Sequence, residues 1–161
     1  MSSFDRRSLL LGLVALPACG FEPVHGTSGA ALGLYEQILF EAPNDANSFN
    51  LRKQLEDRLG RNDAAPYTMA VSLDLRTENL AITSEQSINR LNVIGTARYE
   101  VRRTGTPEVL DQGKVNNFTG YSASGSTVAT SSARDDAFER LTTTLADQIV
   151  SRLYATSSGW Q

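Results

Sequence analysis

Cysteine and histidine are almost absent from this chain of 161 residues, which has one of each. Zinc sites are usually built from several cysteine or histidine ligands, so the common sets cannot be assembled. A serine or cysteine hydrolase triad would have only His25 as its base. That histidine lies in a stretch rich in glycine, proline and small residues, where a solvated side chain is expected. We therefore expect no metal, no cofactor and no hydrolase triad.

An excess of positive charge is also lacking, and so is a long hydrophobic run. The chain has 15 lysine and arginine residues against 18 aspartate and glutamate residues, for a formal net charge of −3 at pH 7. This balance argues against a general affinity for nucleic acid. The apolar run at residues 9–16 would span about 12 Å as a helix, whereas a helix that crosses a bilayer needs roughly 20 residues. We expect neither a nucleic-acid partner nor a stable membrane span.

The N-terminal segment has the layout of a secretory signal. Arg6 and Arg7 precede the apolar run, which ends at the junction Leu16-Pro17-Ala18-Cys19. The position of the thiol resembles the bacterial lipobox, in which the cysteine is acylated, with palmitate as a typical chain, and becomes the mature N-terminus. The alternative is that Cys19 is simply a small buried hydrophobe. The two arginines suit both twin-arginine export and an ordinary signal.

The chain accordingly divides into four parts. Residues 1–18 form the expected lipoprotein signal peptide, and residues 19–33 form a lipidated N-terminus and linker. Residues 34–155 form a single domain, and residues 156–161 a flexible tail. Without the signal peptide, 143 residues remain, with 13 basic and 17 acidic side chains. This length suits one compact domain, and lipidation of Cys19 would leave no thiol for a disulfide.

Hydrophobic patterns predict four strands in this domain. A short apolar run predicts the first strand at 34–41, and clean alternation of apolar and polar residues predicts strands at 67–75 and 91–103. A last strand is expected at 109–121, interrupted near Gly113. Short turns between the later strands favour an antiparallel meander.

Two amphipathic helices accompany these strands. The first is expected at 47–60, with a leucine row on one face at Leu51, Leu55 and Leu59. The second begins with a capping box at Ser132 and carries the apolar stripe Phe138, Leu141, Leu145, Ile149 and Leu153. Asp135 and Asp136 would lie in its first turn. Adjacent residues on a helix do not face each other, so these acids favour the helix dipole and not a catalytic or metal pair.

The predicted order β-α-β-β-β-α indicates an α+β fold, a two-layer sandwich with an approximately four-stranded sheet and both helices on one face. The other face would be open. Its side chains are polar and mixed in sign, and they include Thr68, Ser72, Asp74, Thr96, Arg98, Glu100 and Arg102. Such a face is either solvated or seated in a hydrated cavity of a partner. A third hypothesis, a lipid-anchored hydrolase using carboxylates such as Glu100 or Asp74, lacks a paired-carboxylate motif.

The chain resembles the LptE family, the lipoproteins of lipopolysaccharide assembly at the outer membrane. The resemblance covers nearly the whole chain and is cumulative. It consists of the lipobox that runs into Cys19-Gly20-Phe21-Glu22-Pro23, the element order, the leucine-row helix followed by strands, and the run Ser132-Ala133-Arg134-Asp135-Asp136-Ala137-Phe138 before the closing helix.

The resemblance implies a non-enzymatic protein that plugs and helps assemble the LptD outer-membrane barrel and helps deliver lipopolysaccharide to the outer leaflet. Gly20 after Cys19 implies transfer to the outer membrane, with the domain facing the periplasm. Described members also bind lipopolysaccharide through basic side chains, for which this sequence offers Arg76, Arg90 and Arg134 without a matching motif. The alternative is an auxiliary lipoprotein of an ABC-type lipid transporter.

Overall fold

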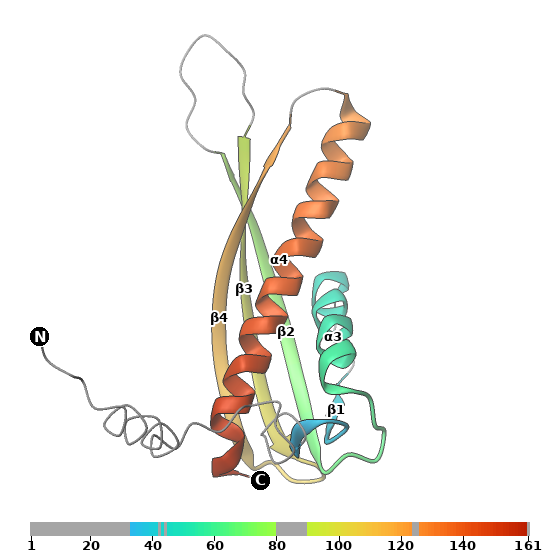
Figure 1. The fold of residues 1–161 in the computed structure, drawn as a ribbon, viewed down its shortest axis with the longest axis vertical. Helices are drawn as coiled ribbons and strands as arrows, with labels where there is room; N and C mark the ends of the chain where they lie inside the picture. Colours follow the sequence, from blue (N-terminus) through green and yellow to red (C-terminus); the bar gives the residue numbers. More distant parts are fainter. Residues whose placement is uncertain (1–32, 42, 44, 80–89, 124–125, 161) are drawn as a thin grey trace, which may run out of the picture.

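Four strands form one mixed sheet in the order β1-β2-β3-β4, and two helices pack against it (Figure 1). The computed structural model describes residues 33–41, 43, 45–79, 90–123 and 126–160. The elements are β1 (Ile38–Phe40), α3 (Ala46–Leu59), β2 (Tyr67–Asn79), β3 (Arg90–Arg103), β4 (Val109–Ser122) and α4 (Thr127–Thr156). The α+β fold and the order β-α-β-β-β-α that the sequence predicts are confirmed.

The strands pair in two ways. β1 runs parallel to β2, with Ile38 opposite Tyr67, and α3 forms the crossover that a parallel pair requires. β2, β3 and β4 form the expected antiparallel meander. β1 is shorter than the predicted strand 34–41, because Gly33 and Leu34 are helical and Tyr35 and Glu36 form a turn.

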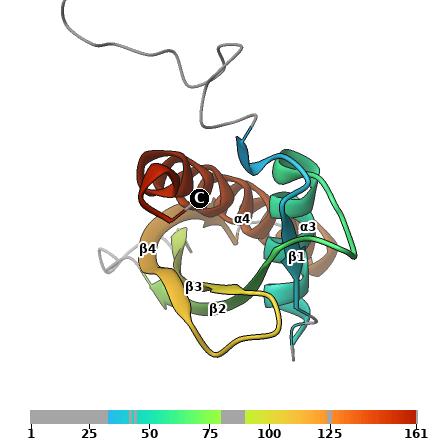
Figure 2. The same cartoon turned by 90° about the horizontal axis from the view of Figure 1, so that it is seen from below.

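Both helices cover the same face of the sheet. Figure 2 shows the sheet curling around α4, with α3 beside β1. The leucine row of α3 and the stripe of α4 are buried against odd-numbered strand residues such as Met69, Val93 and Val101. α4 crosses β3 closely at Gly95, where a Cβ atom would lie 2.8 Å from Cδ1 of Leu145. The core therefore lies entirely on this side of the sheet.

Two local predictions are corrected by the structure. α4 begins at Thr127 and not near Ser132, and the side chain of Ser126 accepts the backbone N–H of Ala129 as the N-cap. Asp135 and Asp136 consequently lie in the third turn and not at the helix dipole. β4 runs unbroken through residue 113, and the irregularity lies instead opposite residues 101 and 102, where the register shifts.

The chain end has contacts that the expected frayed tail does not anticipate. α4 continues to Thr156, and Ser157–Gly159 form a 3-10 turn whose first serine is fully buried. The ring of Trp160 meets the ring of Tyr67 edge to face, with centroids 5.0 Å apart. Within the described ranges, no helix is both long and apolar enough to cross a membrane.

Candidate interface on the open sheet face

The face of the sheet away from the helices carries the even-numbered residues of β2, β3 and β4. The register places Thr68 opposite Arg102, and Ser72 opposite Arg98, as neighbours on this face. Asp74 lies opposite Thr96 in the same way. The polar face predicted from the alternation is therefore present. Its one strongly exposed large hydrophobe is Phe118, 67% exposed, opposite Ile94.

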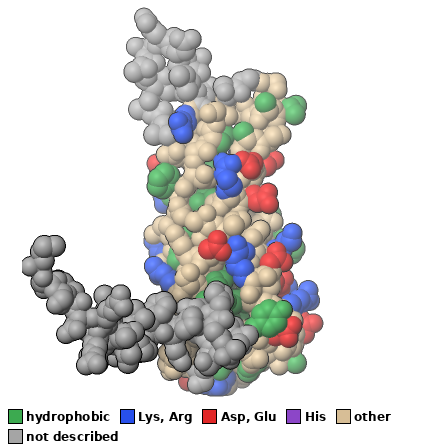
Figure 3. Space-filling view, viewed as in Figure 1, with side chains coloured by type: hydrophobic (Ala, Val, Ile, Leu, Met, Phe, Trp, Pro, Cys, Tyr) green, Lys and Arg blue, Asp and Glu red, His purple; other side chains and the backbone are tan. Residues whose placement is uncertain are grey.

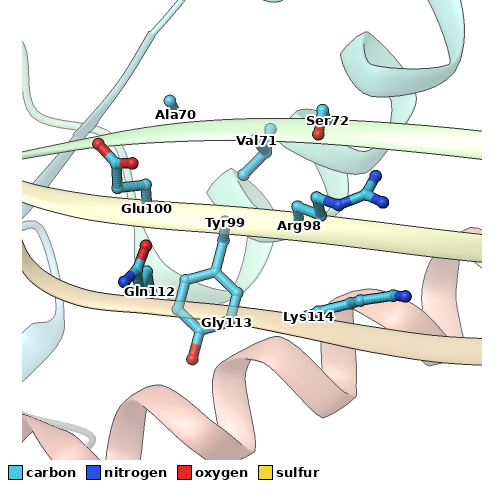
Figure 4. Close-up of a pocket in the computed structure, with 9 residues that line it drawn as sticks. All are labelled: Ala70, Val71, Ser72, Arg98, Tyr99, Glu100, Gln112, Gly113 and Lys114. Carbon is cyan, nitrogen blue, oxygen red and sulfur yellow. The ribbon is translucent and has the colours of Figure 1, made fainter.

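A shallow hollow of about 490 Å³ lies in the middle of the open face (Figure 4). The side chains at its centre are short, because Ala70 and Ser72 stand on β2 and Gly113 contributes only backbone on β4. Gly113 is required on the opposite side of the sheet, where a Cβ atom would come within 2.6 Å of the ring of its cross-strand neighbour Tyr99. Burial, and next the negative charge of Asp111, raise the pKa of that tyrosine above its ordinary value of 10.0.

Charged side chains surround the hollow, and most of them neutralise one another. Arg102 is paired with Glu100, and Nε of Arg76 lies 3.8 Å from a carboxylate oxygen of Asp74. Arg98 and Lys114 differ, because they stand directly opposite each other on β3 and β4. Among the residues that the structure describes, neither side chain has an ion pair or hydrogen-bond partner. The centre of the open face therefore has an uncompensated positive charge.

The three arginines proposed as lipopolysaccharide contacts are not brought together. Arg76 lies on β2 opposite Ile94, and Arg90 begins β3 four residues further along, about 14 Å away at the usual rise of a strand. Arg134 is on α4, in the helix layer and not in a loop, and its guanidinium lies 5.6 Å from the centre of the Phe138 ring. It also pairs with Asp135 at 3.2 Å. Arg76 and Arg90 thus share the open face, whereas Arg134 lies on the opposite layer.

The carboxylates considered for a hydrolase do not form a catalytic pair. The register separates Asp74 and Glu100 by four residues along β3, about 14 Å, whereas the two acids of a glycosidase stand roughly 5 to 9.5 Å apart. Each acid is engaged by an arginine. The described part of the chain also contains no cluster of histidine, cysteine and carboxylate residues that would suit a metal ion.

The helix layer presents a different charge pattern. Blue and red side chains alternate over it in Figure 3, without an extended patch of one sign. Pairs across and along the helices account for this pattern, because Nε of Arg58 lies 2.6 Å from a carboxylate oxygen of Asp147, and Arg140 pairs with Asp136 one turn away. The uncompensated cations Arg98 and Lys114 therefore distinguish the open face from the helix layer.

Sequence reasoning placed Arg98 on the open face but missed Lys114. The alternation within 109–121 was the signal that could have placed it, because even-numbered residues there share one face. The predicted lipid-attachment residue Cys19 lies outside the described residues, and so do the signal peptide and most of the linker.

Comparison with known proteins decides the family. The family model of LptE, described as lipopolysaccharide-assembly, matches residues 35–153. The chain belongs to the LptE family. This match spans all four strands and nearly all of α4, so the open face and its hollow lie within the LptE domain. No curated protein matches the chain closely enough to count as a relative.

Solved structures with the same fold are distant in sequence. A Caulobacter crescentus protein, provisionally named a lipoprotein, has a TM-score of 0.69 at 19% identity, covering 83% of this chain and 98% of its own. Rare lipoprotein B from Shewanella oneidensis has a TM-score of 0.58 at 13% identity, covering 76% and 96%. A minor lipoprotein from Acinetobacter baumannii has a TM-score of 0.56 at 17% identity, covering 75% and 92%. These likenesses establish the fold.

Proposed function

We propose that this LptE-family protein is an outer-membrane lipoprotein that faces the periplasm and is anchored through acylated Cys19. In this proposal it plugs and helps assemble an LptD-type barrel, and it takes part in the delivery of lipopolysaccharide to the outer leaflet. It catalyses no reaction. The observation that carries the proposal is the family match over residues 35–153, which covers the whole sheet.

The chemistry of the open face supports a barrel as the partner. Burying unpaired charges against an apolar surface costs several kcal/mol, so a face bearing Arg98, Lys114 and Glu100 needs a polar, hydrated surrounding. The interiors of wide transmembrane barrels are polar, unlike their lipid-facing bands. A domain with this face would therefore fit inside such a barrel without leaving charges dry.

Purification from native membranes in mild detergent tests the barrel partnership. We expect the protein to elute in a stable complex with an outer-membrane barrel protein. A monodisperse monomer would contradict the proposal. Cross-linking in cells extends the test, because capture of ABC-transporter subunits in place of a barrel would favour the auxiliary-lipoprotein alternative.

The lipid anchor has its own test. One acyl chain holds a protein only marginally at a membrane, whereas several chains anchor it stably. Cys19→Ala should therefore move the protein out of the membrane fraction, while His25→Ala, a change in the same segment, should not. Mass spectrometry of the mature N-terminus should show an acylated Cys19. An unmodified thiol, or a cut at another residue, would refute the anchor.

A further inference from the structure

The pairing of Arg98 with Lys114 is unfavourable in the protein alone. Directly opposed residues of an antiparallel pair have Cβ atoms about 5 Å apart, and like charges at such positions destabilise a sheet. Figure 4 shows both head groups pointing the same way along the sheet, whereas the carboxylate of Glu100 points the other way. No acid of the described residues compensates either cation.

We propose that Arg98 and Lys114, with the hydroxyl of Ser72, form a binding site for a phosphate group on the open sheet face. Ser72 lies opposite Arg98 on the β2 side, so Arg98 has a hydroxyl on one flank and an ammonium on the other. All three residues line the hollow of about 490 Å³, which leaves room for a phosphate and the group that carries it. The proposal does not depend on a barrel partner.

The charge count favours phosphate over a carboxylate side chain. A phosphate monoester carries nearly two negative charges and three acceptor oxygens at neutral pH, which matches a guanidinium, an ammonium and a hydroxyl. A carboxylate has one charge and would leave one of the two cations uncompensated. Glu100 opposes an anion only weakly, because Arg102 already neutralises it.

Titration of the full-length protein in a neutral detergent tests the site. The probes are inorganic phosphate and dihexanoyl phosphatidic acid, with chloride at matched ionic strength as the reference. Binding is followed by amide chemical shifts. We expect saturable shifts at residues 72, 98 and 114 for phosphate, in the millimolar range because both cations are exposed. Arg98→Gln and Lys114→Gln should each weaken binding about fivefold, as expected for one charge-assisted contact near the surface.

Two controls distinguish a site from general charge attraction. Lys53→Gln removes one positive charge from α3, on the other layer, and should leave phosphate affinity unchanged. Both open-face variants should be at least as stable as the wild type, because each relieves the like-charge pair; this separates loss of binding from loss of fold.

The two probes identify the source of the phosphate. Tighter binding of the phosphatidic acid than of inorganic phosphate, lost in Arg98→Gln, supports the site with a lipid headgroup as its ligand. Equal affinities support the site with a free phosphate. Shifts that chloride reproduces, or an equal loss in Lys53→Gln, would overturn the proposal. It is independent of the proposed function, since a complex that still forms with a barrel would leave this failure standing alone.

Discussion

Replacement of Ser48 by alanine should destabilise the protein by about 2 kcal/mol, because a single hydroxyl ties α3 to its cap and to the sheet. The side chain of Ser48 is 1% exposed. Its Oγ donates a hydrogen bond to Oδ2 of Asp45 at 2.6 Å and accepts the backbone N–H of Leu73 at 2.9 Å. Leu73 lies beyond Met69, the last residue of β2 that pairs with β1. In the wild type, the hydroxyl therefore serves this N–H in place of a strand neighbour.

The magnitude follows from what each group loses. A buried N–H left without an acceptor costs about 1 to 3 kcal/mol, and here the N–H of Leu73 would lose its partner. The hydrogen bond from the hydroxyl to Asp45 is lost as well. The helix cap itself survives, because Oδ1 of Asp45 still accepts the backbone N–H of residue 48 at 2.9 Å. A loss of about 2 kcal/mol is thus the expected sum.

Urea unfolding measures this loss, with the single tryptophan of the chain as the fluorescent reporter. Ser131→Ala is the matched control, because its hydroxyl bonds only to an exposed carbonyl within α4, and its effect should stay within about 0.5 kcal/mol. A loss of less than about 0.5 kcal/mol in Ser48→Ala would refute the reasoning. It would show that water or a backbone shift satisfies the N–H of Leu73.

The same contact predicts a dependence on acid. The hydrogen bonds from the hydroxyl and the N–H of Ser48 lower the pKa of Asp45 below its ordinary value of 3.8. A depressed folded-state pKa stabilises the protein above the ordinary value, and that stability is lost as the pH falls through the folded-state pKa. The loss below pH 3.8 should therefore be shallower in Ser48→Ala than in the wild type. Equal slopes in the two proteins would contradict this assignment.

Three further predictions follow from other contacts. Gly113→Ala should lower the unfolding free energy by about 1 to 3 kcal/mol because its Cβ would meet the Tyr99 ring at 2.6 Å, and truncation of that ring in a Tyr99→Leu background should shrink the penalty. The raised pKa of Tyr99 means that the folded state keeps this proton longer, so stability should fall as the pH rises above 10.0, and less steeply in Tyr99→Phe. The emission of Trp160 should shift to longer wavelength on unfolding, because its ring packs on Tyr67, and an unshifted spectrum would contradict that contact.

The strand faces could be predicted from the sequence because each strand of the meander is buried on one side only. Tyr67, Met69 and Leu73 alternate with polar residues, and this period of two places them on the helix face. The first two turns of α4 left no such signal, because residues 127–134 bury no side chain and extend beyond α3 (Figure 1). Serine and threonine in that stretch favour caps and turns, so Ser132 offered as good a start as Ser126.

The candidate site could be predicted only in part, because its residues come together through register. Arg98 was placed on the open face by alternation alone. Its position opposite Lys114 depends on the pairing of β3 with β4, which shifts by one residue between Val101 and Arg102. A slip of one residue moves every side chain of a strand to the other face, and a bulge of this kind has no local sequence signal comparable to a turn. The resemblance to the LptE family likewise gave the fold and not the site.

The two layers of the domain suit different surroundings. On the helix layer, Arg58 and Arg140 have carboxylate partners within the chain, so this surface is electrostatically self-contained and its stability needs no other molecule. At the centre of the open face, Arg98 and Lys114 repel each other and obtain nothing from their neighbours. A protein could lower its free energy there by exchanging one cation for a neutral residue. An unfavourable pair is justified physically by an anion that binds it, and the hollow beside the pair has space for that anion.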